Sequence, residues 1–208
     1  MSEHQPIRIA KIGGSLLDYP LLPVRFRDWI GSKAPARNLV VAGGGPFVES
    51  VREAQPRFHL SDAVCHVLCM ELLNVTARLL YEILAPSVPC VWVGTEPKLR
   101  QFLNDDADVR IGIAATGELL NQIGDRAGEG IPALPESWEV TSDSLAIRLA
   151  IQLRAKELVL LKSENCPGHD WMERAALGYV DRLFPYLAVR FGGQIGAVNL
   201  RADPFVGS

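Results

Sequence analysis

The chain has 208 residues, 48% of them hydrophobic, and a formal net charge of −3. This length suffices to bury a full core as one large or two small domains, and the charge provides no positive field for nucleic acid or an anionic membrane. With no basic, signal-like N-terminal segment and no run of roughly 18 to 20 apolar residues, we expect a cytoplasmic protein without nucleic-acid or membrane partners. The four cysteines are too few for a disulfide framework.

A first strand is expected at residues 7–12, where apolar and polar residues alternate before a glycine pair. Lys11 stands at its carboxyl end, and Gly13, Gly14 and Ser15 follow. A strand that ends in a glycine turn leaves backbone N–H groups aimed at one point, which favours a phosphate. We therefore interpret Lys11 as a point charge for a transferring phosphoryl group; the alternative is a surface lysine on an edge strand.

A second strand, 38–42, leads directly into Gly43, Gly44 and Gly45. A proline follows, and proline is favoured in the first turn of a helix, so we expect a helix over residues 46–54. Glycines between a buried strand and a helix favour close approach of the backbone to a ligand, with a flexible turn as the alternative. The two glycine turns together predict a shared phosphate site.

The longest helix is expected over residues 62–84, capped by Ser61 and free of glycine and proline. It is apolar on most sides, which suits both a core face and a homo-oligomer interface. Cys65, His66 and Cys69 lie together on this helix, but three candidate ligands on an apolar helix do not predict a metal site.

Asp143 falls in the first turn of a helix that Thr141 or Ser142 can cap, where the helix dipole favours a carboxylate. Either this is only a well-capped helix, or Asp143 faces the phosphate pocket and orients a lysine or a metal-bound phosphate. Lys162 and Ser163 end another apolar strand. Because ligands gather at the carboxyl edge of parallel sheets, Lys162 is the second cationic candidate, with a solvated lysine as the alternative.

Strands and helices alternate along the chain, which predicts an α/β fold: a three-layer sandwich on a mostly parallel sheet. Residues 109–135 are interrupted by glycines and suit either a mobile lid or a long connection. The acidic turn at 104–108 is interpreted as a solvated loop rather than a cation site. The remaining strands are expected at 88–93, 157–161 and 195–200, and the remaining helices at 24–30, 96–103, 142–154 and 185–191.

Most of the chain resembles the amino acid kinase family, which includes the acetylglutamate, aspartate, uridylate and isopentenyl phosphate kinases. The matching segments, in chain order, are 11–15, 40–45, 141–146 and 158–163. Within the family, Trp138 and the stretch 178–185 look most like the kinases of methanofuran-type cofactor synthesis. Those enzymes convert an aminomethylfuran-methyl phosphate to its diphosphate.

The resemblance implies one domain over 1–208, with an acceptor-binding part of about 1–135 and a shortened nucleotide-binding part of about 136–208. It implies ATP and Mg²⁺ as cofactors, no protein metal ligand, and a phosphorylated small molecule as acceptor. The implied catalytic residues are Lys11, Asp143 and Lys162, with Asp143 aligning the lysines. The implied nucleotide contacts are Gly13, Gly14, Ser15, Lys162, Ser163 and Gly168, and the implied acceptor contacts are Gly43, Gly44 and Gly45.

The resulting prediction is an ATP-dependent kinase that transfers the γ-phosphoryl group to a phosphomonoester. Two alternatives stay open: a carboxylate kinase of the aspartate or acetylglutamate kind, and a non-catalytic protein that binds a nucleotide or an oxyanion. The family's late lysine after a glycine pair is missing from residues 192–196. Lys162, Arg190 and Arg201 are the candidates to replace it.

Overall fold

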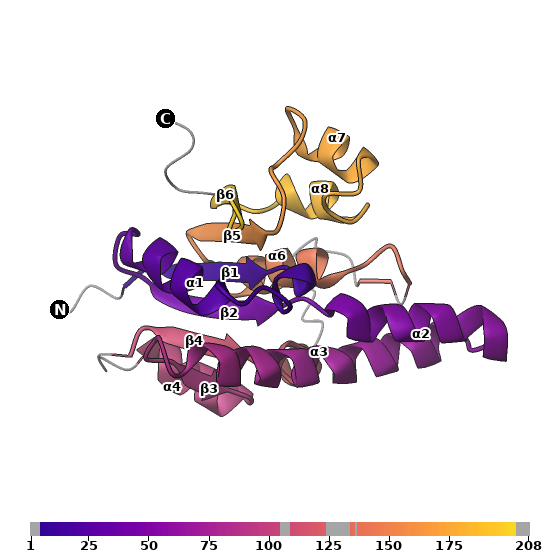
Figure 1. Ribbon diagram of the computed structural model, residues 1–208, viewed down its shortest axis with the longest axis horizontal. Helices are drawn as coiled ribbons and strands as arrows, with labels where there is room; N and C mark the ends of the chain where they lie inside the picture. Colours follow the sequence, from indigo (N-terminus) through magenta and orange to yellow (C-terminus); the bar gives the residue numbers. More distant parts are fainter. Residues whose placement is uncertain (1–4, 105–108, 124–133, 136, 203–208) are drawn as a thin grey trace.

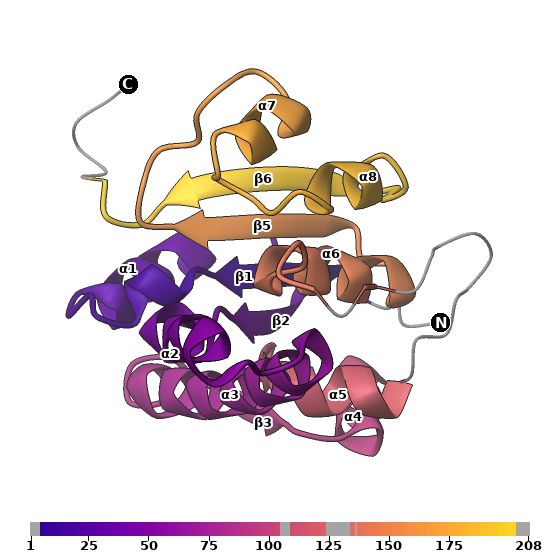
Figure 2. The ribbon, with the colours of Figure 1, turned by 90° about the vertical axis from the view of Figure 1, so that its right-hand side faces the viewer.

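The computed structural model describes residues 5–104, 109–123, 134–135 and 137–202. Within them, six strands form one sheet in the order β3-β4-β2-β1-β5-β6, and every neighbouring pair is parallel. Figure 2 shows the strands stacked from β6 and β5 through β1 and β2 to β3. The expected α/β sandwich on a parallel sheet is confirmed. The strands are β1 (Ile7–Ile12), β2 (Arg37–Ala42), β3 (Val91–Val93), β4 (Ile111–Ala114), β5 (Glu157–Lys162) and β6 (Gln194–Asn199).

Helices cover both faces of this sheet, because successive strand side chains point to opposite sides and both sets are apolar. Ile9 and Leu39 face one side, in the cluster that contains Ile147 of α6. Ala10 and Val40 face the other side, with α1 and α3. The helices are the 3₁₀ helix η1 (Gly14–Leu16), α1 (Leu22–Gly31), α2 (Gly45–Phe58), α3 (Asp62–Leu84), α4 (Glu96–Asn104), α5 (Thr116–Ile123), α6 (Ser142–Gln152), α7 (Trp171–Ala176) and α8 (Phe184–Ala188).

Helix α3 begins as the sequence predicts: the Ser61 side chain accepts a hydrogen bond from the amide of Val64. Contrary to expectation, α3 is long and apolar enough to cross a membrane by length and composition, with a mean hydropathy of 1.5 in its most apolar window. Leu73, Ala77 and Leu80 are buried, however, and the helix packs against β2 and β4. It is therefore the core helix of this side, and with α2 it extends beyond the sheet (Figure 1).

Two elements lie inside the stretch that the sequence left unassigned, β4 and α5. All four residues of β4 are buried, so no alternation marks it, and α5 is only eight residues long. Helix α7 was not predicted either. Helix α2 continues to Phe58 through an internal proline, and α8 ends at Ala188 rather than at 191. Residues 105–108, from the acidic turn, and 124–133, from the proposed lid, lie outside the described residues.

The order of the strands places a topological switch point at the centre of the sheet. From β1 the chain passes to β2 on one side, while β5 pairs with β1 on the other. At such a switch point the connections leave in opposite directions, so the carboxyl ends of the two strands border an open space where ligands bind in α/β proteins. The chain places Lys11 and Lys162 at these two strand ends.

Candidate active site

The lysines of β1 and β5 point to the same face of the sheet. The parallel register places Lys11 of β1 beside Leu160 of β5. Lys162 lies two residues beyond Leu160, so its side chain is on the same face as Leu160 and Lys11. Helix α6 packs against β1 and β5 on this face, and its first turn carries Asp143. Thr141 caps that turn by accepting a hydrogen bond from the amide of Asp143, at 3.3 Å. The fold thus directs two cations and one carboxylate to a single point.

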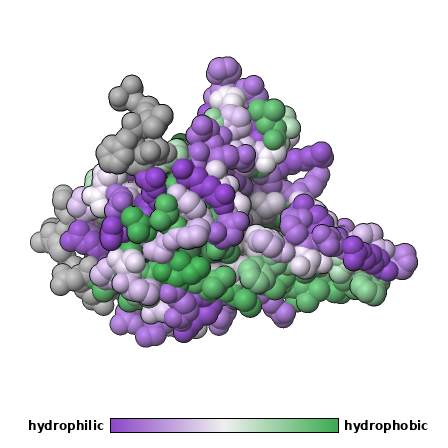
Figure 3. Space-filling view, viewed as in Figure 1, coloured by the Kyte–Doolittle hydropathy of each residue, from purple (hydrophilic) through white to green (hydrophobic). Residues whose placement is uncertain are grey.

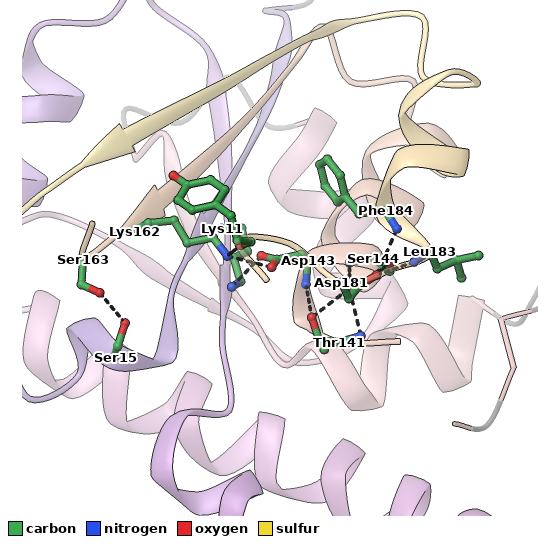
Figure 4. A network of polar contacts seen from close by, with 11 residues as sticks. Lys11, Ser15, Thr141, Asp143, Ser144, Lys162, Ser163, Asp181, Leu183 and Phe184 are labelled. Carbon is green, nitrogen blue, oxygen red and sulfur yellow. Dashed lines mark hydrogen bonds and ion pairs between the residues drawn. The ribbon is translucent and has the colours of Figure 1, made fainter. Parts of the chain in front are cut away.

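Asp143 bridges the two lysines (Figure 4). Its Oδ1 atom lies 2.7 Å from Nζ of Lys11, and its Oδ2 atom lies 2.8 Å from Nζ of Lys162. Lys162 also donates to the carbonyl oxygen of Tyr179 at 2.7 Å, and its ammonium lies 5.0 Å from the centre of the Tyr179 ring. The Lys11 and Asp143 side chains are each 5% exposed and that of Lys162 is 12% exposed, so water screens this cluster little.

Burial and charge act in opposite directions on these groups. Burial lowers the pKa of Lys11, and nearby Lys162 lowers it further, whereas Asp143 raises it. Burial opposes the ionised form of Asp143, but the two ammonium groups outweigh it and keep the pKa of this carboxyl below its usual value. Two ammonium groups and one carboxylate carry a formal charge of +1, which the nearby carboxylate of Asp181 offsets. The two ammonium groups at the carboxyl edge of the sheet are suited to hold an anion beside them.

The two glycine turns pack against each other next to this cluster. A Cβ atom on Gly14 would lie 2.1 Å from the amide nitrogen of Gly45, and one on Gly43 would lie 2.6 Å from that of Gly14. Gly45 has a φ of 55°, in the left-handed region. The amide of Gly13 donates to Leu161 O and that of Gly43 to Ile12 O, both at 2.8 Å. Those two amides are therefore committed to the protein backbone.

A cavity of about 660 Å³ opens beside the glycine turns, between α2, α3 and the segment that leads into α6. Gly14, Gly44 and Gly45 line one end. The indole N–H of Trp138, which also lines it, donates to the side-chain oxygen of Gln55 and so ties this segment to α2. The guanidinium of Arg52 lies 4.9 Å from the centre of the Trp138 ring. The apolar lining includes Val48, Cys65, Cys69, Met70, Leu73 and Leu145.

The thiols of α3 belong to this apolar lining. Burial raises the pKa of Cys69 to about 11, so the thiol is uncharged at neutral pH and poorly suited to attack or to bind a metal. Among the described residues, no group of three or more His, Cys, Asp or Glu side chains is placed to hold a metal ion.

The other predicted site residues are placed as follows. The hydroxyls of Ser15 and Ser163 lie 2.8 Å apart, joining the turn after β1 to that after β5. Gly168 lies in the turn before α7 with a φ of 65°, where a Cβ atom would contact Glu173. Of the three candidates for the late lysine, Lys162 joins the Asp143 cluster. Arg201 instead donates to Ser15 O and pairs with Asp18, and Arg190 donates to Tyr186 O.

Sequence reasoning missed two features of the site. Asp181 accepts hydrogen bonds from the first turn of α6, and Trp138 closes the cavity onto α2. In sequence, Asp181 looks like a local cap for α8, whose first amides it does bind. Its partners near residue 141 are forty positions away, so no short-range pattern could reveal them.

The chain has the fold of the amino acid kinases, with a sheet of six parallel strands flanked by helices. It is similar to UMP kinase from Bacillus anthracis, with a TM-score of 0.65 and 14% identity over 98% of this chain and 91% of that one. Uridylate kinase from Archaeoglobus fulgidus gives a TM-score of 0.59 and 13% identity over 90% and 88% of the two chains. Aspartate kinase from Synechocystis gives 0.60 and 17%, over 94% of this chain and 38% of that one. No family model and no curated protein matches the sequence.

Proposed function

We propose that the protein is an ATP-dependent kinase that transfers the γ-phosphoryl group of ATP to a phosphorylated small molecule. The observation that carries this proposal is the buried bridge of Lys11, Asp143 and Lys162 at the switch point of the sheet. Phosphoryl transfer requires mainly that two anions be placed in line and that their charge be stabilised. Two fixed ammonium groups beside a packed glycine turn supply such an environment.

In the proposed reaction, a phosphate oxygen of the acceptor attacks the γ-phosphorus of ATP. The bond from that phosphorus to the β-phosphate oxygen breaks, and ADP leaves. Lys11 stabilises the negative charge on the transferring group, while Asp143 holds both ammonium groups in place. An acceptor phosphate is already anionic, so no strong base is needed. Mg²⁺, bound through the phosphates of ATP, supplies further neutralisation of charge.

We assign the phosphoryl donor, ATP, and the acceptor to different sides of the cluster of Lys11, Asp143 and Lys162. The donor phosphates lie at Gly13, Gly14 and Ser15, with Ser163, Lys162 and Gly168 towards the nucleotide, in a nucleotide-binding part of about 136–208. The acceptor lies at Gly43, Gly44 and Gly45, in an acceptor-binding part of about 1–135, and in the cavity beyond, whose wall also includes Trp138 and Leu145 of the second part. Gly44 and Gly45 line this cavity, and Gly14 and Ser15 of the donor side line it too, so it adjoins both proposed sites. The commitment of the Gly13 amide to Leu161 O leaves Gly14 as the better donor of a hydrogen bond to phosphate.

The lining of the cavity supports one class of acceptor. The indole ring of Trp138 lines the cavity and suits stacking against a flat ring. The charged residues of the lining are mostly acidic. Asp18, Glu49, Glu53 and Asp62 line the cavity together with Arg52, and Asp18, Glu49 and Glu53 already pair with Arg201, Arg52 and Arg57. A ring that stacks on Trp138 and a phosphate at the glycine turns are the acceptor features that this lining supports. We propose an aminomethylfuran-methyl phosphate as this acceptor, on the resemblance of Trp138 and residues 178–185 to the kinases of methanofuran-type cofactor synthesis.

The direct test is a screen of acceptors with ADP formation as the readout. Phosphomonoesters with an amine-bearing ring should give the highest turnover, and aspartate or N-acetylglutamate should give none. A carboxylate kinase would instead form an acyl phosphate, which hydroxylamine traps. ATP binding in calorimetry without turnover on any acceptor would favour the non-catalytic alternative.

We further propose that the protein is a cytoplasmic homo-oligomer without nucleic-acid partners. Figure 3 shows apolar side chains gathered in a band over α3. Val64, Val67, Val75 and Leu79 are each more than a third exposed, and at 100° per residue they fall on one side of the helix. We call these four residues the α3 face. A second copy of the chain would bury this face by symmetry.

A further inference from the structure

Asp181 accepts hydrogen bonds from two separate segments of the chain around the site, the start of α6 and the start of α8. Its Oδ2 atom accepts from the amide and hydroxyl of Thr141 and from the amide of Ser144, at 3.0, 2.8 and 3.0 Å. Its Oδ1 atom accepts from the hydroxyl of Ser144 at 2.5 Å and from the amides of Leu183 and Phe184 at 3.1 and 3.0 Å. Figure 4 shows this carboxylate between the start of α6 and the start of α8.

These bonds lead directly to the lysine bridge. The Thr141 hydroxyl donates to Asp181 and accepts from the amide of Asp143, so a single hydroxyl lies between the two aspartates. Asp181 therefore determines where the first turn of α6 begins, and that turn carries the carboxylate that binds both lysines. A displacement of this turn would change both ion-pair distances at once.

The second lysine depends on the same segment of chain. Tyr179 lies two residues before Asp181, and its carbonyl oxygen accepts from Nζ of Lys162 at 2.7 Å. The stretch 179–181 thus contacts the lysine of β5 through a backbone carbonyl and the first turn of α6 through a side chain. Both partners of the Asp143–Lys162 ion pair are positioned from one short segment.

We propose that Asp181 is a positioning residue for phosphoryl transfer, acting through Thr141 and Tyr179 to hold Asp143 and Lys162 in register with Lys11. The proposal rests on the proposed kinase function, because the reaction gives the geometry its use. Asp181 itself does not contact the reacting groups. Charge stabilisation of a transferring group depends steeply on position, so a loosened cluster should bind ATP yet turn it over slowly.

The test compares Asp181→Ala with Asp170→Ala. Asp170 is a matched control because its side chain also caps a helix, accepting from the amide of Glu173 at 2.8 Å, while its helix, α7, carries none of the lysine-bridge residues. We expect Asp181→Ala to lower kcat by about 10- to 100-fold with the KM for ATP changed less than about threefold. Asp170→Ala should leave kcat within about twofold of wild type. Equal kcat values for the two folded variants would overturn the proposal.

A second pair of variants, with smaller changes, tests the proposal if Asp181→Ala does not fold. Thr141→Val removes only the hydroxyl between the two aspartates, and Thr76→Val removes a buried threonine hydroxyl that donates within α3, to Leu73 O at 3.1 Å. We expect a loss of kcat of about tenfold or more in the first variant and none in the second. Equal kcat values in this pair would likewise contradict the proposal.

A second readout separates this proposal from the kinase function itself. The rate at which an acylating reagent labels Lys11 and Lys162 is measured by mass spectrometry and requires no turnover. Labelling should rise at least about fivefold in Asp181→Ala and stay at the wild-type rate in Asp170→Ala, because only the first releases the bridge. If wild type lacks kinase activity, the proposed function fails and labelling still decides the positioning role. Unchanged labelling of both lysines in Asp181→Ala would overturn it.

Discussion

Oδ1 of Asp143 lies 2.7 Å from Nζ of Lys11, and both side chains are 5% exposed. An ion pair this deeply buried makes each charge depend on the other, because either alone would be a desolvated ion without a partner. The pair also lies at the carboxyl edge of a parallel sheet, the edge at which ligands gather in α/β proteins. Its charge state should therefore control both the proposed phosphoryl transfer and its dependence on pH.

The first prediction concerns alkaline pH. Burial lowers the pKa of Lys11 from its ordinary 10.5, so the ammonium loses its proton at a lower pH than an exposed lysine would. If transfer needs this charge, kcat should fall on the alkaline side with an apparent pKa below 10.5. Asp143 raises the pKa of Lys11, so in Asp143→Asn the decline should move to lower pH. Turnover measured from about pH 6 to pH 10 tests this.

Lys11→Arg provides the control, because an arginine keeps its charge over this range. Its remaining activity should show no alkaline decline. A decline at the same pH in wild type, Asp143→Asn and Lys11→Arg would mean that another group titrates.

The second prediction concerns the contact of the two glycine turns. In Gly14→Ala the added Cβ would lie 2.1 Å from the backbone nitrogen of Gly45, and the backbone cannot yield without separating the turns. We expect a loss of about 2 kcal/mol or more in unfolding free energy and weaker ATP binding. Gly31→Ala is the control, since a Cβ there meets nothing within 4 Å. It should leave ATP binding unchanged and stability equal or higher by about 0.5–1 kcal/mol.

Denaturant titration and calorimetry measure these quantities. A Gly14→Ala variant with wild-type stability and ATP affinity would show that the turns do not need this close approach.

The sequence predicted the residues of the lysine bridge more fully than the residues that line the cavity. Lys11 and Lys162 each stand at the carboxyl end of a strand, so the alternation of the first strand and the apolar run of the other located them at one sheet edge. Asp143 follows a recognisable cap. The cavity could not be predicted, because Trp138 and Gln55 are 83 positions apart and only folding brings them together. Strand β4 was missed because a four-residue run buried on both faces has no period to detect.

The third prediction concerns the cavity wall. Trp138→Ala removes a ring that Arg52 covers at 4.9 Å and that ties the segment before α6 to α2. We expect the KM for the acceptor to rise by about tenfold or more, with the KM for ATP changed by less than about twofold. Trp171→Ala is the matched control, since Arg174 covers its ring at 4.4 Å on α7. It should leave the KM for the acceptor unchanged, and an equal rise in both variants would contradict the assignment of the cavity to the acceptor.

The fourth prediction concerns the α3 face. Val75 is 54% exposed on it, and Val75→Arg would place a charge where a second copy should pack. We expect the variant to sediment as a monomer under conditions in which wild type is an oligomer. Val189→Arg, at a valine that is 88% exposed outside this face, should keep the wild-type oligomeric state. A Val75→Arg variant with the wild-type sedimentation coefficient would exclude the α3 face as the interface.

The central claim is that the charge of Lys11 drives phosphoryl transfer to the acceptor. The most direct measurement is the rate of ADP formation from ATP with the best phosphomonoester acceptor, comparing wild type, Lys11→Ala and the surface control Lys33→Ala. Circular dichroism and thermal melting confirm that each variant is folded. We predict that Lys11→Ala lowers kcat by about a thousandfold or more while Lys33→Ala stays near wild type. A folded Lys11→Ala variant with near-normal turnover would contradict the account.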